Sequence, residues 1–209
     1  MRQNRKIPLK GKPKYAIVVD GETEFWYIQM LKRNERLISV DLKPEIPQRK
    51  KLSEQYAKVI ELSKDYKEVY WIIDFDAINK ETREAKKGDK TALQELKEYY
   101  NNIREIKKIK IIINNPCFEY WLLLHFEATV KFYSTYDEML KQLRKHLPDY
   151  EKTQKYYTKQ DKDIYLRLKA QLSVGIANAK KTEKFDFANP KKGISQMHIL
   201  IEDIFNPNK

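Results

Sequence analysis

The segment YAIVVDGETEFWY, residues 15–27, contains the transition that decides the fold. Residues 15–19 are apolar and rich in β-branched side chains, which predicts a buried strand. An acidic turn with Asp20, Glu22 and Glu24 follows at once. Apolar residues then recur at helical spacing, which predicts a helix directly after the turn. The residues of this apolar stripe are Phe25, Trp26, Ile28, Met30 and Leu31.

The alternation of strand and helix continues beyond this segment. The apolar runs 68–74 and 108–114 predict two more core strands. Residues 37–46 predict a more polar strand, and Pro44 within it favours an edge position because proline cannot donate a backbone hydrogen bond. Amphipathic patterns between the strands predict helices. This order is typical of an α/β, Rossmann-like fold with a mostly parallel sheet flanked by helices.

Local signals predict where some of the helices begin. Thr91 and Gln94 have the spacing of a capping box at a helix start. The charged segment 79–90 before them predicts a loop. Asn115 and Pro116 predict a helix cap and a first helical residue. The following residues, CFEYWLLLHF, are apolar on nearly all sides, so this helix should be deeply buried.

Beyond about residue 130 the strand pattern gives way to helical spacing of apolar residues. We therefore expect a basic flexible arm at 1–14, an α/β core at 15–129, and a helical annex packed on the core at 130–209. The apolar residues that predict the annex helices are Leu140, Leu143 and Leu147, then Ile164, Leu168, Leu172, Ile176 and Ala179, and finally Ile194, Met197, Ile201 and Ile204.

Composition narrows the class of protein. The chain of 209 residues has a formal net charge of +12, which favours a polyanionic partner such as DNA or RNA. A lysine-rich surface that serves only solubility would give the same charge. The single cysteine, Cys117, excludes an internal disulfide and favours the reducing cytoplasm. No apolar run approaches the roughly 20 residues of a membrane span, so we expect no membrane partner.

Acidic residues follow several of the predicted strands. Asp20 and Glu24 follow the first, and Asp74 and Asp76 end the run 68–74. In an extended segment Asp74 and Asp76 point to the same side. Because the carboxyl ends of parallel strands share one edge of the sheet, these side chains should converge, and Glu119 should join them. Clustered carboxylates repel one another unless a cation neutralises them, which predicts Mg²⁺, or Mn²⁺ in its place.

Each acid also has a simpler interpretation. An aspartate at a strand end is often the cap of the next helix. Glu22 is a solvated acid of the first helical turn that complements the helix dipole. An isolated D-x-D pattern is common in solvated turns. The conjunction of acids at two strand ends favours the metal site over these alternatives, with Asp20, Glu24, Asp74 and Asp76 as the metal ligands.

Other candidate residues carry weaker signals. Lys152 is a candidate to neutralise a scissile phosphate, and Lys155 and Lys159 are candidates to hold a nucleic-acid strand. His125 is expected to be a core or helix-end histidine, and Cys117 a small buried hydrophobe. Tyrosines among these lysines either stack on unpaired bases or cover the annex core, and the sequence leaves both open. These tyrosines are Tyr150, Tyr156, Tyr157 and Tyr165.

The segments VVDGETEFWYIQML, WIIDFDAI and INNPCFEYWLLLHF together resemble the RloB-like family. Weaker similarities lie in LPDYEKT, GIANAKK and NPKKGISQMHILI, so the resemblance covers about residues 14–205. It implies a Toprim domain, the fold shared by bacterial primases, type II topoisomerases and OLD-type nucleases, and a Mg²⁺-dependent nuclease site. It also implies an effector in anti-phage or restriction-linked defence, including abortive infection, that works with an ATPase partner.

The family's motifs map onto the acids found above. The strand-end glutamate of the family falls on Asp20, and the glutamate of its G-x-T-E pattern falls on Glu24. The D-x-D pair falls on Asp74 and Asp76, and the acid of the Asn-Pro motif falls on Glu119. Asp20 stands where the family has a glutamate, and its side chain is one methylene shorter. The resemblance therefore supports metal binding more strongly than cleavage.

These observations predict a Mg²⁺-dependent nuclease that cleaves DNA or RNA, including tRNA, with Asp20, Glu24, Asp74, Asp76, Glu119 and Lys152 as its catalytic residues. The first alternative is a catalytically weak or inactive module that binds nucleic acid or the ATPase. The second is a receiver-like α/β switch phosphorylated on an aspartate, against which the helical tail argues. The sequence leaves the oligomeric state open.

Overall fold

The computed structural model of the protein describes residues 14–19, 21–36, 41–45 and 51–205. The expected basic arm therefore lies outside the described residues, apart from Lys14. Asp20 also lies outside them. Of the predicted strand 37–46, only residues 41–45 are described.

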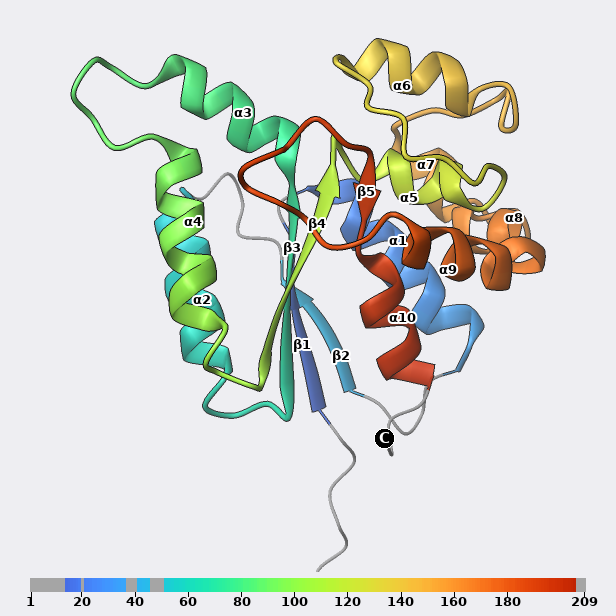
Figure 1. The fold of residues 1–209 in the computed structure, drawn as a ribbon. Helices are drawn as coiled ribbons and strands as arrows, with labels where there is room; N and C mark the ends of the chain where they lie inside the picture. Colours follow the sequence, from blue (N-terminus) through green and yellow to red (C-terminus); the bar gives the residue numbers. More distant parts are fainter. Residues whose placement is uncertain (1–13, 20, 37–40, 46–50, 206–209) are drawn as a thin grey trace, which may run out of the picture.

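A single five-stranded sheet forms the centre of the molecule, in the order β2-β1-β3-β4-β5 (Figure 1). The pairs β1–β2, β1–β3 and β3–β4 are parallel, and β4–β5 is antiparallel. The predicted mostly parallel α/β sheet is thus confirmed, and β2, which contains Pro44, lies at the edge as expected. The strands are β1 (Lys14–Val18), β2 (Asp41–Glu45), β3 (Glu68–Asp74), β4 (Ile109–Asn115) and β5 (Ile194–Ser195).

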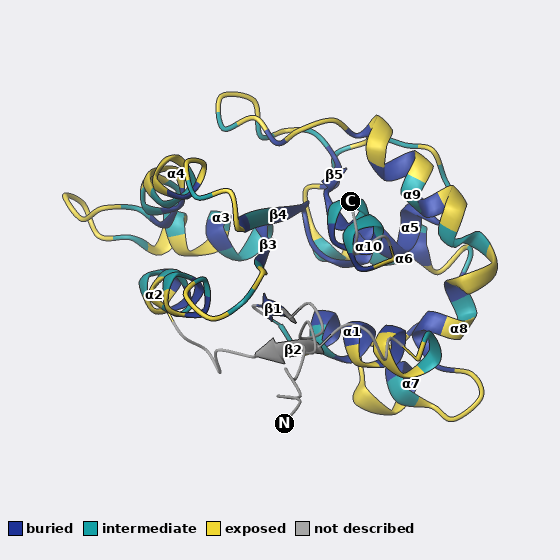
Figure 2. Ribbon diagram, turned by 90° about the horizontal axis from the view of Figure 1, so that it is seen from below, coloured by how far each residue is buried: buried dark blue, intermediate teal, exposed yellow. Residues whose placement is uncertain are grey.

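Helices cover both faces of this sheet (Figure 2). The helices in the first half of the chain are α1 (Glu22–Asn34), α2 (Leu52–Leu62), α3 (Phe75–Glu84) and α4 (Ala92–Ile103). They are followed by α5 (Glu119–Leu124), α6 (Tyr136–Leu143), α7 (Gln154–Thr158), α8 (Ile164–Leu168), the short 3-10 helix Lys169–Gln171, α9 (Leu172–Lys181) and α10 (Met197–Phe205).

The alternation of strand side chains divides the core in two. Ile17, Tyr70 and Ile112 face one side of the sheet and pack with α1, α5 and α10. Val18 and Trp71 face the other side and pack with α2, α3 and α4. Each fully buried side chain of this kind stabilises the fold by about 1.5–3 kcal/mol. The two cores fix the sheet between its helical layers, so the carboxyl ends of its parallel strands form a well-defined edge, called here the carboxyl edge.

The carboxy-terminal part differs from a purely helical annex. Ile194 and Ser195 form β5 and pair with Asn115 and Asn114 of β4, so this part of the chain completes the sheet. The expected long helix over 164–179 is divided into α8, a 3-10 turn and α9. Among the described residues, no helix combines the length and apolar character needed to cross a bilayer.

Two local predictions are wrong for identifiable reasons. The expected loop 79–90 begins inside α3, because buried Phe75 and Ile78 anchor a helix on the sheet despite the charges that follow. Asn115 belongs to β4 instead of capping a helix, and its Nδ2 donates to the carbonyl oxygens of Pro190, at 2.6 Å, and Lys192, at 2.8 Å. The following helix, α5, begins only at Glu119.

Two other predictions of helix structure are confirmed. The capping box of Thr91 and Gln94 is present at the start of α4. All of the residues in α5 are buried, as the apolar pattern indicated.

Gly193 allows the return of the chain to the sheet. Its backbone N–H donates to the carbonyl oxygen of Val130 at 3.0 Å, just before β5. A Cβ atom at this position would overlap the Tyr120 hydroxyl and the carbonyl oxygen of Lys131. Neither group can move freely, since one is backbone and the Tyr120 hydroxyl donates to the carbonyl oxygen of Thr129 at 2.9 Å.

We predict that Gly193→Ala destabilises the protein by about 1–3 kcal/mol, the usual cost of overpacking a closely fitted site. Urea denaturation followed by circular dichroism measures the change. Ala188→Ser, at an exposed position in the same loop, is the control and should leave the free energy of unfolding unchanged. Equal stability of Gly193→Ala and wild type would show that the return of the chain to the sheet does not depend on this close approach.

Candidate active site

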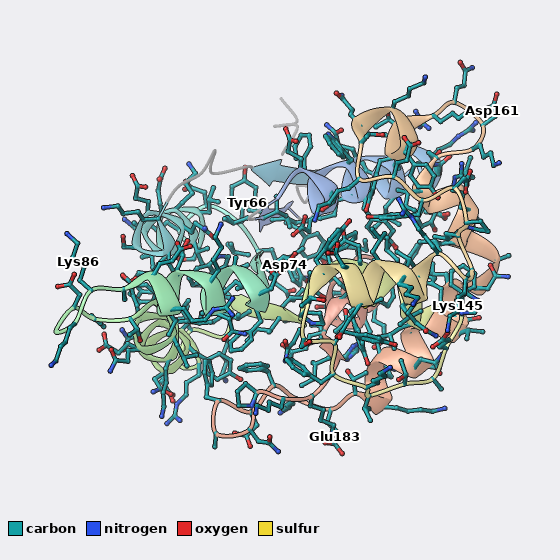
Figure 3. All side chains as sticks on the ribbon, turned by 90° about the horizontal axis from the view of Figure 1, so that it is seen from above. Tyr66, Asp74, Lys86, Lys145, Asp161 and Glu183 are labelled. Carbon is teal, nitrogen blue, oxygen red and sulfur yellow. The ribbon has the colours of Figure 1, made fainter. Side chains whose placement is uncertain are left out.

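A cleft of about 250 Å³ opens at the carboxyl edge of the sheet. It lies where β1 and β3 lead into α1 and α3. In Figure 3, which looks down on this edge, Asp74 lies between α3 and α6. The residues that line the cleft are Gly21, Glu22, Thr23, Glu24, Trp26, Asp74, Asp76, Ala77 and Lys152.

Glu24, one of these lining residues, is buried in the first turn of α1. Its Oε2 accepts a hydrogen bond from Thr23 Oγ1 at 2.7 Å. A Cβ atom at position 21 would lie 2.7 Å from the same oxygen, so Gly21 leaves the space that the carboxylate occupies. Burial raises the pKa of Glu24 to about 7, and the charge of Glu119 adds to the increase while Thr23 and Lys152 oppose it.

Asp74 ends β3 and is 8% exposed. Burial raises its pKa well above the usual value, and the charges of Glu24, Asp76 and Glu119 raise it further. Asn114 Nδ2 lies 3.5 Å from Asp74 Oδ1, at the long limit of a hydrogen bond. Ser195 Oγ donates to Asn114 Oδ1 at 2.7 Å and so fixes the orientation of that amide.

Asp76 lies on the cleft, but for a different reason from the one expected. The chain is not extended through 74–76, because α3 begins at Phe75 and Asp76 lies in its first turn. Phe75 turns into the core and contacts Phe185, with ring centroids 4.5 Å apart. The Asp76 N–H donates to the carbonyl oxygen of Pro116 at 2.9 Å, which holds the start of α3 close to the end of β4.

Glu119 and Lys152 form an ion pair beside the carboxylates. Lys152 Nζ lies 3.0 Å from Glu119 Oε1, and Glu119 is fully buried whereas the lysine side chain is 46% exposed. Burial lowers the pKa of Lys152, but the charges of Glu119 and Asp74 outweigh it and the pKa is raised. The ammonium group therefore stays charged next to the cleft, where it offsets part of the repulsion among the acids.

The carboxylates suit an open magnesium site. In the part of the chain that the structure describes, no three His, Cys, Asp or Glu side chains form a group that could hold a metal ion by themselves. Mg²⁺ is commonly held by one or two carboxylates, with water and substrate phosphates as its other ligands. Glu24 and Asp74 fit this arrangement, because both are buried on the cleft and the charge of one raises the pKa of the other. Asp20, the fourth expected ligand, lies outside the described residues.

The remaining candidates separate clearly. Glu22 lines the cleft and is exposed, while Lys155 and Lys159 are exposed and do not line it. His125 is a core residue, as expected: burial lowers its pKa to about 4, and its Nδ1 lies 3.0 Å from the carbonyl oxygen of Trp121. Cys117 is buried, as predicted, and burial raises the pKa of its thiol.

The tyrosines of the carboxy-terminal part, which left two interpretations open, pack into the main core. Their rings are thus not free to stack on bases. These are Tyr150, Tyr156, Tyr157 and Tyr165.

Several residues at the site were not predicted to belong to it. Tyr136 begins α6, and its ring centroid lies 5.1 Å from Lys152 Nζ. Tyr150 donates to Glu119 Oε1 at 2.9 Å. Ser195 reaches the site only through the pairing of β5 with β4. Thr23 and Trp26 lie within two positions of Glu24 in the sequence. This closeness to a candidate metal ligand is the signal that could have identified them as site residues.

The fold and the cleft define a class of α/β protein with carboxylates gathered at the carboxyl edge of a parallel sheet. Within this class, the chain belongs to the RloB-like protein family, whose model matches residues 15–204. The match confirms the family that the sequence motifs suggested, and it continues across the expected boundary between core and annex. Comparisons with curated proteins and with solved structures give no match.

We predict that Glu24→Gln stabilises the protein in EDTA at pH 8 by about 1–3 kcal/mol. The pKa of Glu24 is raised in the folded state, from 4.5 to about 7, so its ionisation costs stability as the pH rises through 7. The cost shrinks as the pH falls from 7 and is fully lost only below 4.5, so the difference between the two proteins should be much smaller at pH 5 than at pH 8. Thermal denaturation at pH 5 and pH 8 measures the difference.

Glu22→Gln is the matched control for this experiment, because Glu22 lines the same cleft and is exposed. It should change the melting temperature little at either pH. A Glu24→Gln protein that is no more stable than wild type at pH 8 would contradict the electrostatic cost assigned to the buried carboxylate.

Proposed function

We propose that this protein is a Mg²⁺-dependent nuclease that cleaves phosphodiester bonds in DNA or RNA. The observation that carries the proposal is a pair of buried carboxylates, Glu24 and Asp74, on a cleft that also holds the Lys152 ammonium. Buried carboxylates with raised pKa values cost stability, and such groups concentrate at functional sites. The positive charge of the chain supports a polyanionic substrate.

The residues of the site have distinct roles in this proposal. Glu24 and Asp74 would hold the magnesium ion, with Asp20 and Asp76 as further candidate ligands. A bound magnesium ion polarises a phosphoryl oxygen and lowers the pKa of a coordinated water. Lys152 would neutralise the charge that develops on the phosphate during cleavage. Thr23 would orient Glu24, and Asn114 would orient Asp74.

Membership of the RloB-like family supports the wider context of the proposal. We propose that the chain has the Toprim relationship that its motifs suggest. We also propose a cytoplasmic role as an effector of phage defence, working with an ATPase partner.

A second candidate function is a module of this fold that binds nucleic acid or the ATPase without cleavage. Two features favour it. The described residues contain no group of three metal-binding side chains, and Asp20 stands where the family has a longer glutamate.

A cleavage assay separates the two functions. Labelled single-stranded DNA, duplex DNA, mixed RNA and tRNA are incubated with the protein in Mg²⁺, in Mn²⁺ or in EDTA. We expect cleavage with either metal ion and none in EDTA, and we expect Asp74→Asn to reduce the rate by about 10²-fold or more because it removes a ligand of the metal ion. Asp89→Asn, at an exposed acid beyond α3, is the control and should retain full activity. Salt-sensitive binding without cleavage, unchanged by Asp74→Asn, would instead establish the binding module.

Magnesium binding is testable without a substrate. We predict that Mg²⁺ raises the melting temperature of the wild-type protein, by an amount that corresponds to about 1.4 kcal/mol when the ion is at ten times its Kd. Neither Glu24→Gln nor Asp74→Asn should respond to the ion. An equal response in all three proteins would place the ion elsewhere.

A further inference from the structure

A chain of buried hydrogen bonds ends at the Lys152 ammonium. Tyr157 Oη lies 2.7 Å from Tyr150 Oη, and Tyr150 Oη lies 2.9 Å from Glu119 Oε1. The same Glu119 oxygen is 3.0 Å from Lys152 Nζ. Tyr150, Tyr157 and Glu119 are each at most 1% exposed, whereas Lys152 reaches the cleft. The buried series of hydrogen bonds therefore ends at one charged group that a substrate can contact, the Lys152 ammonium.

The direction of these hydrogen bonds is determined. A tyrosine hydroxyl has one proton, and Tyr150 gives it to the carboxylate of Glu119. The contact between the two tyrosines therefore has Tyr157 as its donor. Burial raises the pKa of both hydroxyls well above 10, so both keep their protons at any physiological pH. Glu119 is thus held by the fixed Tyr150 hydroxyl from the segment before α7, and Tyr157 of α7 holds that hydroxyl in turn.

The position of Lys152 follows from that of Glu119. Its side chain is 46% exposed and would otherwise sample many conformations. Two groups restrain the ammonium: the Glu119 carboxylate at 3.0 Å and the ring of Tyr136, whose centroid is 5.1 Å away. Tyr157 also contacts Trp26 of the cleft wall, with ring centroids 5.7 Å apart. The same aromatic group therefore supports both the wall and the lysine.

Glu119 does not resemble the other acids at the site. It has a cation of the chain at ion-pair distance and a tyrosine donor on the same oxygen, whereas Glu24 has only the Thr23 hydroxyl among the side-chain hydrogen bonds seen in the described residues. Glu119 also does not line the cleft. Its Oε1 is therefore already used by Lys152 and Tyr150, while its buried Oε2 has no hydrogen-bond partner in the described part of the chain.

We propose that Tyr150 and Tyr157 are positioning residues that fix Glu119, and that Glu119 aims the Lys152 ammonium at the substrate phosphate instead of binding the metal ion. This inference rests on the proposed cleavage of phosphodiesters, because it assigns roles in that reaction to Lys152 and Glu119. The placement of a catalytic group within about 1 Å affects rates by as much as about 10²-fold, so small changes in this support should be measurable.

Steady-state cleavage kinetics test the assignment in Tyr150→Phe, Tyr157→Phe, Glu119→Gln, Lys152→Met and the double variant Tyr150→Phe/Lys152→Met. We expect kcat to fall about 10²-fold in Lys152→Met and about 10-fold in Tyr150→Phe, with less effect in Tyr157→Phe. The Mg²⁺ concentration for half-maximal activity should be unchanged in all of them, Glu119→Gln included. In the Lys152→Met background, Tyr150→Phe should change kcat less than about twofold, because its effect passes through the lysine.

Tyr156→Phe is the matched control, since its hydroxyl lies outside this chain of hydrogen bonds and its ring is buried beside Tyr157. It should leave kcat unchanged. A Glu119→Gln protein that needs about 10-fold more Mg²⁺ would make Glu119 a metal ligand and overturn the inference while the nuclease stands. An equal loss of kcat from Tyr150→Phe in the presence and absence of Lys152 would also overturn the inference, because the effect of the substitution would then be purely structural.

A binding assay keeps the test independent of cleavage. In the Asp74→Asn background, fluorescence anisotropy with a labelled oligonucleotide should show weaker binding for Lys152→Met and a salt dependence reduced by about one counterion. Tyr150→Phe should weaken binding only while Lys152 is present. If binding changes in this way but the wild-type protein does not cleave, the proposed nuclease activity is refuted and the positioning role of the tyrosines is retained. Binding that ignores Lys152 in a wild type that does not cleave would refute both.

Discussion

Repulsion among carboxylates that the fold buries at one edge of its sheet is the constraint on which the rest of the structure depends. Parallel pairing of β1 with β3 brings Glu24 and Asp74 to the same edge, and both are buried there. In the described part of the chain, the side chains that oppose the repulsion include the Thr23 hydroxyl, the Asn114 amide and the Lys152 ammonium. Such an arrangement lowers stability, and buried groups of this kind concentrate at functional sites.

The site is assembled from both parts of the chain. The acids come from the α/β core, through the turns that follow β1 and β3. Part of their support comes from the carboxy-terminal part: Lys152 contributes the cation, and Ser195 orients Asn114. The carboxy-terminal part is therefore a component of the site in addition to a cover for the sheet, which agrees with a family match over residues 15–204.

Much of the core of this structure could be predicted from the sequence, because its signals are local. Runs of β-branched residues gave three strands, and the order of strands and helices gave their parallel pairing. Glu24, Asp74 and Asp76 follow those strands directly, so their common position on the cleft needed only the rule that parallel strands end together. For Asp76 the reasoning was nevertheless incomplete, since the helix beginning at Phe75 depends on buried contacts that charge counting does not register.

The parts that could not be predicted depend on long-range pairing. A strand as short as Ile194–Ser195 has no measurable periodicity, and it exists because Asn114 and Asn115 offer a partner. Tyr136 has no signal in the sequence, and Tyr150 was predicted only to stack on bases or cover the annex core, until the fold brings Glu119 and Lys152 to them. Asn115 resembled a helix cap because the carbonyl groups it binds, those of Pro190 and Lys192, lie far along the sequence.

The late position of β5 in the chain has a consequence for biosynthesis. Synthesis proceeds from the amino terminus, so the acidic turns after β1 and β3 emerge from the ribosome long before residue 195. The hydrogen bond from Ser195 to Asn114, and with it the final setting of Asp74, forms only when nearly all of the described chain has been made. A nascent polypeptide therefore carries the acids in an unfinished arrangement until β5 pairs with β4.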